Sequence, residues 1–378
     1  MLSSIFFVTL ILAYSAGIIS YINSSFLETR LSTQYVGIVF TLAYLGAALF
    51  INYYAGIIRR YSNYRAFIAV LLIYSVCLSL LPFTEHVLGV TLLFVFYIVS
   101  LSLLWISLDI FMHGFSKYGN IGEIRGMNLT LMNLGIMLGP VTAGFLIARY
   151  GFSSVYLFSS FLAVMMVLFT WQNFRYMETK ISEYSVDNIS SFFKKIIRRV
   201  ELRDIFVIAF LLQFFYSWMI IYTPIYLTSL GFSYSEIGIM FAIMLAPFVI
   251  FEIPAGYLAD KYLGETEMVT LGLLIMAFST VCVFFVSGFW SFTIVLFVSR
   301  VGASIVEIMR DSYFYKIIKD KDIELINLFR ATGPVSRIIA PLIATVVIAF
   351  FPMRYLYLLL GIVMAGGIFF TLRMPDTK

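Results

Sequence analysis

The sequence is a succession of long apolar runs separated by short polar connections. A transmembrane helix needs about 20 mostly apolar residues to cross roughly 30 Å of hydrocarbon, and twelve runs have about that length. The spans are predicted at residues 4–23, 35–58, 66–83, 88–113, 126–148, 153–173, 205–228, 235–258, 267–287, 289–315, 326–350 and 354–372. The pattern therefore predicts an all-α polytopic membrane protein with twelve transmembrane helices and no separate soluble domain.

Lysine and arginine are distributed unevenly between the two sides of the membrane. Because the number of predicted spans is even, both termini lie on the same side. Of the 25 Lys and Arg residues, nineteen fall on that side, three on the opposite side and three within spans, namely Arg300, Arg310 and Arg337. Positively charged connections stay in the cytoplasm. We therefore predict an integral protein of the plasma (inner) membrane with both termini cytoplasmic.

The composition argues against several other classes of protein. The chain is 62% hydrophobic and 12% charged, against roughly 45–50% and 25% in soluble domains. Its net charge of +5 comes mainly from the connections, which suits orientation in a lipid bilayer and predicts no nucleic-acid partner. Cys77 and Cys282 lie inside apolar runs, which indicates packing rather than a disulfide or a metal site. We expect a monomer without cofactor or metal.

The longest polar connection divides the chain into two halves. Residues 175–203 separate an N-terminal six-helix bundle, residues 1–174, from a C-terminal six-helix bundle, residues 204–378. The connection is cytoplasmic in the predicted topology and becomes basic and amphipathic between Phe192 and Arg199. Such a segment either lies on anionic lipid or serves as a tether between two bundles, and we favour the tether.

The two halves resemble each other at a spacing of about 200 residues. Residues 35–40, Tyr-Val-Gly-Ile-Val-Phe, recur as residues 236–241, Glu-Ile-Gly-Ile-Met-Phe, and Asp109 matches Asp311. Many transporters are built from repeated halves and bind substrate near the midplane between them. The repeat therefore predicts two pseudo-symmetric bundles of a transporter.

The connection between the eighth and ninth spans carries a motif. Residues Gly256 to Gly264 read Gly-Tyr-Leu-Ala-Asp-Lys-Tyr-Leu-Gly, which resembles the signature loop G-x-L-A-D-R-x-G-R of the major facilitator superfamily with one extra residue. The resemblance implies a role in conformational gating for Gly256 and Asp260, since glycine permits close helix approach and an acid can interact with a helix N-terminus. Glu252 resembles the acid of E-I-P-x-G variants and is assigned the same role. The first half departs from the pattern, with Arg60 in place of the acid.

A second motif lies in the fifth span. Gly135, Gly139, Pro140 and Gly144 follow the superfamily's antiporter-associated pattern G-x-x-x-G-P-x-x-G-G, with Ala143 in the penultimate place. Small residues permit tight helix packing, and a proline removes one backbone hydrogen bond and bends the helix. The resemblance implies that the four motif residues take part in gating and that the protein is similar to drug/proton antiporters.

The tenth span carries the densest set of polar residues. Arg300, Ser304, Glu307 and Asp311 follow at i, i+4, i+7 and i+11, so they lie within about 60° of one another on one helix face. Charged side chains within hydrocarbon are costly and usually face the bundle interior. A rise of about 1.5 Å per residue puts Arg300 about 16 Å deep, near the midplane. Arg300 either contacts substrate or pairs with an acid such as Glu307 and fastens helices together.

The resemblance further implies that spans 1, 4, 7 and 10 line the central cavity. The candidate substrate-binding residues are Tyr14, Tyr21, Trp105, Gln213, Tyr216, Trp218, Arg300, Ser304 and Glu307. A single aromatic residue at such a position can equally serve packing. Glu307, helped by Asp109 or Asp311, is the candidate carrier of a transported proton.

No pattern in the sequence supports an enzyme. There is neither an H-E-x-x-H motif nor a glycine-rich phosphate loop with a lysine, so ion or substrate gradients must supply the energy. We predict a secondary active transporter that exports a small molecule by alternating access, coupled to protons. The alternatives are a proton symporter for an anionic nutrient, a non-transporting receptor or lipid-binding protein of the same fold and, least favoured, a membrane-embedded enzyme.

Overall fold

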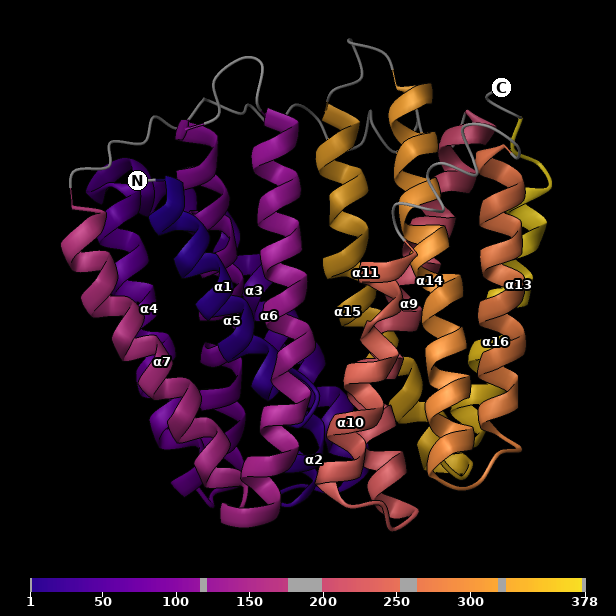
Figure 1. Ribbon diagram of the computed structural model, residues 1–378, viewed down its shortest axis with the longest axis horizontal. Coiled ribbons are helices and arrows are strands. Elements are labelled where there is room, and N and C mark those ends of the chain that lie inside the picture. Colours follow the sequence, from indigo (N-terminus) through magenta and orange to yellow (C-terminus); the bar gives the residue numbers. More distant parts are fainter. Residues whose placement is uncertain (1, 116–120, 176–198, 252–263, 319–323, 376–378) are drawn as a thin grey trace. The chain divides into compact units, whose positions relative to one another are not determined.

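The computed structural model describes residues 2–115, 121–175, 199–251, 264–318 and 324–375. Within these residues the secondary structure is helical and no strand occurs (Figure 1). Ten helices are long and apolar enough to cross a membrane, and α10 and α16 are shorter apolar helices. The described part of the chain therefore confirms the predicted all-α membrane fold.

The helices form two compact units, and the first contains the N-terminal half of the chain. It spans Met1–Glu183 together with Leu227–Ala242. Its elements are α1 (Leu2–Ser20), α2 (Asn23–Glu28), α3 (Thr33–Tyr61), α4 (Asn63–Leu80), η1 (Leu81–Phe83), α5 (Val87–Phe115), α6 (Ile121–Tyr150) and α7 (Phe152–Asn173). Helix α1 packs against α6 and α7, α4 packs against α5 and α7, and α3 packs against α5.

The second unit contains most of the C-terminal half, Tyr184–Tyr226 and Ile243–Lys378. Its elements are α9 (Val200–Ser229), the end of α10 (Tyr234–Leu245), α11 (Pro247–Ile250), α13 (Glu265–Val283), α14 (Phe289–Ile317), α15 (Glu324–Phe350) and α16 (Tyr355–Thr371). Helix α13 packs against both α14 and α16, and α11 packs against α14. Most of the predicted linker, residues 175–203, lies outside the described residues.

The eighth predicted span is interrupted. We expected one helix over residues 235–258, but α10 ends at Leu245 and α11 runs only from Pro247 to Ile250. A proline has no backbone N–H to donate to the preceding turn, so Pro247 ends the regular hydrogen-bond pattern of α10. The rest of this span, with Glu252, Gly256 and Asp260, lies outside the described residues.

Glycines bring two helix pairs into close backbone contact. A Cβ at Gly139 of α6 would meet the backbone of Gly17 in α1, and one at Gly135 would come within 2.8 Å of the backbone nitrogen of Tyr14. In the second unit, a Cβ at Gly302 of α14 would come within 2.6 Å of the Gly272 carbonyl oxygen of α13. Close approach of backbones is how small residues stabilise helix pairs in membranes.

Substitution of Gly139 tests the α1–α6 contact. Gly139→Ala is expected to lower the melting temperature of the purified protein, because the added methyl group has no space and overpacking costs about 1–3 kcal/mol. Gly126→Ala on the same helix is the matched control, since nothing lies within 4 Å of a Cβ there. Equal melting temperatures for the two variants in a fluorescence-detected thermal scan would contradict the contact.

Candidate functional site

An aromatic and charged cluster lies in the second unit between α9 and α14. The Arg300 side chain is only 1% exposed. Its guanidinium carbon lies 5.0 Å from the ring centre of Phe215 and 5.3 Å from that of Tyr216. A cation over aromatic faces is attracted by their ring quadrupoles, more strongly where water is excluded. Two consecutive rings of α9 therefore hold the arginine of α14.

The same tyrosine binds Glu307, the acid that shares one face of α14 with Arg300. The Tyr216 hydroxyl donates a hydrogen bond of 2.8 Å to Oε2 of Glu307. The charged side chains of Arg310, Asp311 and Arg300 lie near Glu307. Tyr216 thus contacts both Arg300, through its ring face, and Glu307, through its hydroxyl. The structure joins three of the predicted site residues in one cluster.

Arg310 and Asp311 lie one turn beyond Glu307, toward the C-terminal end of α14. The Arg310 Nε donates to Oδ1 of Asp311 at 3.0 Å, and its Nη1 donates to the carbonyl oxygen of Ala209 in α9 at 3.4 Å. Its guanidinium carbon lies 5.5 Å from the ring centre of Phe329 in α15. Arg310 therefore links three helices of the second unit.

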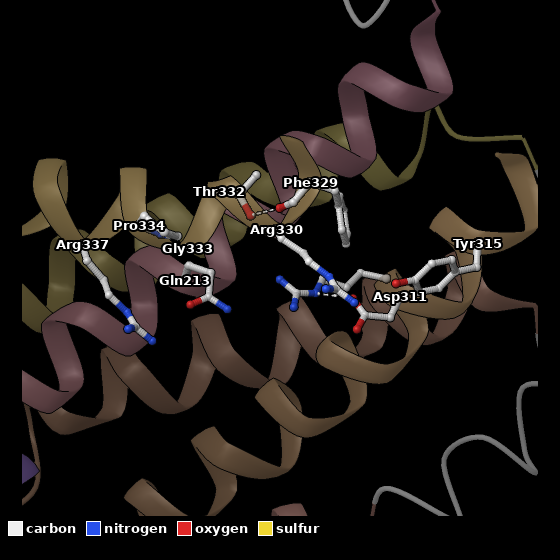
Figure 2. A pocket seen from close by; sticks show the side chains of 10 residues that line it. Gln213, Asp311, Tyr315, Phe329, Arg330, Thr332, Gly333, Pro334 and Arg337 are labelled. Atoms are coloured by element: carbon white, nitrogen blue, oxygen red, sulfur yellow. Dashed lines mark hydrogen bonds and ion pairs between the residues drawn. The ribbon is translucent and has the colours of Figure 1, made fainter. Parts of the chain in front are cut away.

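A cavity of about 330 Å³ lies beside Arg310 between α9, α14 and α15. It is lined by Gln213, Arg310, Asp311, Tyr315, Phe329, Arg330, Thr332, Gly333, Pro334 and Arg337. Figure 2 shows Gln213 between Arg337 on one side and Arg330 with Asp311 on the other. The cavity wall is therefore polar and predominantly cationic.

Two of the cavity residues are not among the predicted ligands. The predicted topology places Arg330 with the nineteen basic residues of the cytoplasmic side, but it lies inside α15, and Arg337 is predicted within a span without a role. The two arginines are seven residues apart, which is about two helical turns and places them on one face of α15. That spacing, together with the cost of arginine within hydrocarbon, was the available signal.

Two other predicted substrate ligands of the second unit make internal hydrogen bonds. The Trp218 indole N–H donates to the carbonyl oxygen of Ala340 in α15 at 2.6 Å, and the ring is 2% exposed. The Ser304 hydroxyl donates to the carbonyl oxygen of Val301 in its own helix at 2.9 Å and is fully buried. In this conformation Trp218 links α9 to α15, and the Ser304 hydroxyl is hydrogen-bonded within its own helix.

The candidates of the first half lie in the first unit. The hydroxyls of Tyr14 and Thr142 form a hydrogen bond of 2.8 Å between α1 and α6. Tyr21 packs its ring 4.8 Å from that of Phe241. On α5, Trp105 is partly buried and Asp109 is exposed.

The predicted gating residues of the fifth span lie on α6 in the first unit. Gly135 and Gly139 contact α1 as described above. Pro140 and Gly144 face α10, because a Cβ at Gly238 would meet the Pro140 carbonyl oxygen and one at Gly144 would come within 3.1 Å of Ser235 Cα. The motif residues therefore form the contact surfaces of α6 with two other helices.

These features define a helical membrane protein with buried charges in one of its bundles. The family model of the Major Facilitator Superfamily matches residues 5–234 and 205–378, so the chain belongs to that superfamily. A comparison with curated protein sequences finds no match. The chain is accordingly a membrane transporter, and the match specifies neither its substrate nor its direction of transport.

Solved structures of transporters share the fold. The POT family transporter PepTSo is 12% identical, with 98% of this chain and 96% of that chain covered and a TM-score of 0.75. A D-xylose–proton symporter is 14% identical, with 100% of this chain and 98% of that chain covered and a TM-score of 0.74. The nucleoside transporter NupG is 10% identical, with 98% of each chain covered and a TM-score of 0.79. The likeness confirms the predicted layout of twelve helices in two bundles.

Proposed function

We propose that this transporter couples the movement of a small molecule to protons, with Glu307 as the carrier of the proton. The observation that supports this proposal is the contact of Glu307 with Tyr216 beside the buried Arg300. Ionisable residues within membrane-spanning helices usually serve substrate or proton pathways. A carboxyl group with a hydroxyl donor and nearby guanidinium groups can gain or lose a proton as its neighbours change.

The coupling follows from competition for arginine. When the guanidinium groups near Glu307 bind an incoming substrate, the carboxylate loses part of its compensating charge and takes up a proton. When the substrate leaves, the arginines again stabilise the carboxylate and the proton is released. Linkage between two ligands is reciprocal, so the proton changes substrate affinity by the same factor as the substrate changes proton affinity. A proton and a substrate that are bound in the same state move in the same direction as the site alternates between the two sides, so for an anionic substrate this scheme is that of a symporter. Export by antiport requires instead that the substrate displace the proton from Glu307.

The direction of transport has two candidates, export by proton antiport and proton symport of an anionic nutrient. The antiporter-like pattern of the fifth span supports export, and Gly139 and Gly144 of this pattern make close contacts of α6 with α1 and α10. The arginines that line the cavity of the second unit suit an anionic nutrient, and they therefore support the symporter alternative. The two candidates require opposite signs of pH gradient.

Flux into sealed proteoliposomes tests the proposal. For an antiporter, an acidic lumen drives accumulation of a labelled substrate, whereas for a symporter an acidic exterior does so. A panel of organic anions and lipophilic compounds is offered under both gradients and under none. Accumulation of a compound under one gradient alone supports proton coupling and assigns the direction. Accumulation that ignores the gradient would overturn proton coupling, and binding without flux would favour a non-transporting receptor.

A further inference from the structure

The cavity between α9, α14 and α15 has an excess of positive charge. Among the residues that the structure describes, the lining contains the three guanidinium groups of Arg310, Arg330 and Arg337 and one carboxylate, that of Asp311, which gives these residues a net charge of +2. Charged residues in membrane-spanning helices are costly to retain without a function. We propose that this cavity binds a small organic dianion, a dicarboxylate or a phosphate monoester, and that this dianion is the substrate class of the transporter.

Arg310, the cavity arginine next to the cluster of Tyr216, Arg300 and Glu307, is held in a fixed position. Arg310 is 8% exposed, and it donates to the Asp311 carboxylate at 3.0 Å and to the Ala209 carbonyl oxygen at 3.4 Å. The ring of Phe329 covers its guanidinium at 5.5 Å. Since its side chain is already ordered, little conformational entropy remains to be lost when an anion approaches. Arg310 therefore provides a preorganised positive charge in the cavity wall.

The other two arginines come from one face of α15 and are exposed to the cavity. Arg330 and Arg337 are seven residues apart, so their Cα atoms are about 10 Å apart along the helix axis. Figure 2 shows Arg337 toward one end of the cavity and Arg330 nearer its middle, with Gln213 between them. A guanidinium group binds carboxylate or phosphate oxygens in a bidentate manner. The two guanidinium groups together can therefore neutralise the two negative charges of a dianion.

The size and the apolar wall of the cavity limit the rest of the ligand. A volume of about 330 Å³ is at the lower end of the range of roughly 300–1,000 Å³ for small-molecule sites. The Phe329 ring is stacked on Phe314 at 3.9 Å with an interplanar angle of 5°. Phe329, which this stacking holds in place, forms an apolar part of the cavity wall beside Arg310. The cavity therefore fits a short carbon skeleton and excludes a bulky lipophilic drug.

The depth of Arg337 favours a soluble anion over a lipid headgroup. Arg337 is the central residue of the 27-residue helix α15, Glu324–Phe350. At about 1.5 Å per residue it lies roughly 20 Å from either end of the helix. The phosphate groups of lipids lie at the membrane surface, beyond a hydrocarbon core of about 30 Å. A dianion that contacts both Arg337 and Arg330 must therefore enter the bundle.

Binding to the purified protein in detergent tests the inference. The probes are succinate, glucose 6-phosphate and inorganic phosphate, with acetate at equal ionic strength as the monoanion control and phosphatidylglycerol in mixed micelles as the lipid control. We expect saturable binding of at least one dianion by calorimetry, and about tenfold weaker binding of acetate. Absence of saturable binding for every dianion would overturn the inference, as would saturable binding of phosphatidylglycerol alone.

Arginine variants locate the binding in this cavity. Arg330→Gln and Arg337→Gln are each expected to raise the Kd of the dianion about tenfold, because each removes one charge-assisted contact. Arg354→Gln is the matched control, since Arg354 is an exposed arginine of the same unit that lies over the Phe284 ring and lines no part of the cavity. An equal loss of affinity in the control variant would overturn the assignment.

This inference rests on the proposed function, but the two fail in different experiments. The binding measurement uses no membrane and no gradient. Dianion binding without any flux in proteoliposomes would overturn the transport proposal and leave the binding site intact. Gradient-driven flux of uncharged or cationic compounds, with no dianion binding, would overturn the assigned substrate class and leave proton coupling intact.

Discussion

Replacement of Glu307 by glutamine is expected to remove the dependence of transport on a pH gradient while sparing substrate exchange. The amide keeps the shape of the side chain and can still accept the hydrogen bond of the Tyr216 hydroxyl, which is 2.8 Å long in the parent. It cannot bind or release a proton at neutral pH. Uptake under an imposed gradient should therefore equal uptake without one. Exchange of labelled for unlabelled substrate, which needs no net proton movement, should continue.

A second glutamate-to-glutamine variant shows whether the loss of gradient dependence is specific to Glu307 or follows from the loss of any acidic charge. Glu267 is an exposed glutamate of α13 in the same unit, and Glu267→Gln is expected to keep the gradient dependence of the parent. Tyr216→Phe, which removes only the hydrogen bond to Glu307, should retain coupling but change the pH at which it is half-maximal. If Glu307→Gln still follows the gradient as the parent does, Glu307 is not the carrier. Asp109, the next predicted candidate, would then be substituted.

Replacement of Arg300 by alanine is expected to reduce substrate flux by about a hundredfold. Arg300 lies over the rings of Phe215 and Tyr216, so its loss frees the tyrosine that binds Glu307. Displacement of a positioned group by about 1 Å can reduce a rate about a hundredfold. Flux in proteoliposomes at saturating substrate measures the effect.

The folded state of the Arg300 variants must be assessed separately, because the side chain is buried. We expect Arg300→Ala to elute as a monodisperse species on size exclusion and Arg300→Lys, which keeps the charge, to recover part of the flux. If both variants aggregate while Tyr216→Phe transports normally, Arg300 serves packing. Parental flux in a folded Arg300→Ala protein would likewise contradict the functional role.

Hydropathy was sufficient to predict the helices, because each apolar run has the length of one membrane crossing. It did not predict where helices are interrupted. Pro140 and Pro224 lie inside continuous helices, whereas Pro247 separates α10 from α11. Neighbouring helices can compensate for the lost hydrogen bond at one proline and not at another. That difference depends on packing, which the hydropathy pattern does not contain.

The candidate site was predictable along one helix and not between helices. The spacing of Arg300 and Glu307 placed them on one face of α14. Their contacts with Tyr216 depend on how α9 packs against α14, and the hydrogen bond joins residues 91 positions apart. Periodicity is a property of a single helix, so it could not identify this partner. For the same reason the cavity residues of α15 were not connected with Arg310.

The proposed coupling makes the movement of a substrate through this protein depend on the movement of protons. Sealed proteoliposomes with a pH-sensitive dye in the lumen test it most directly, because they report protons moved by a substrate gradient alone. Addition of a transported substrate outside is predicted to change the lumen pH in the parent and to leave it unchanged in Glu307→Gln. Substrate entry without any pH change in the parent, or an equal pH change in Glu307→Gln, would contradict the claim.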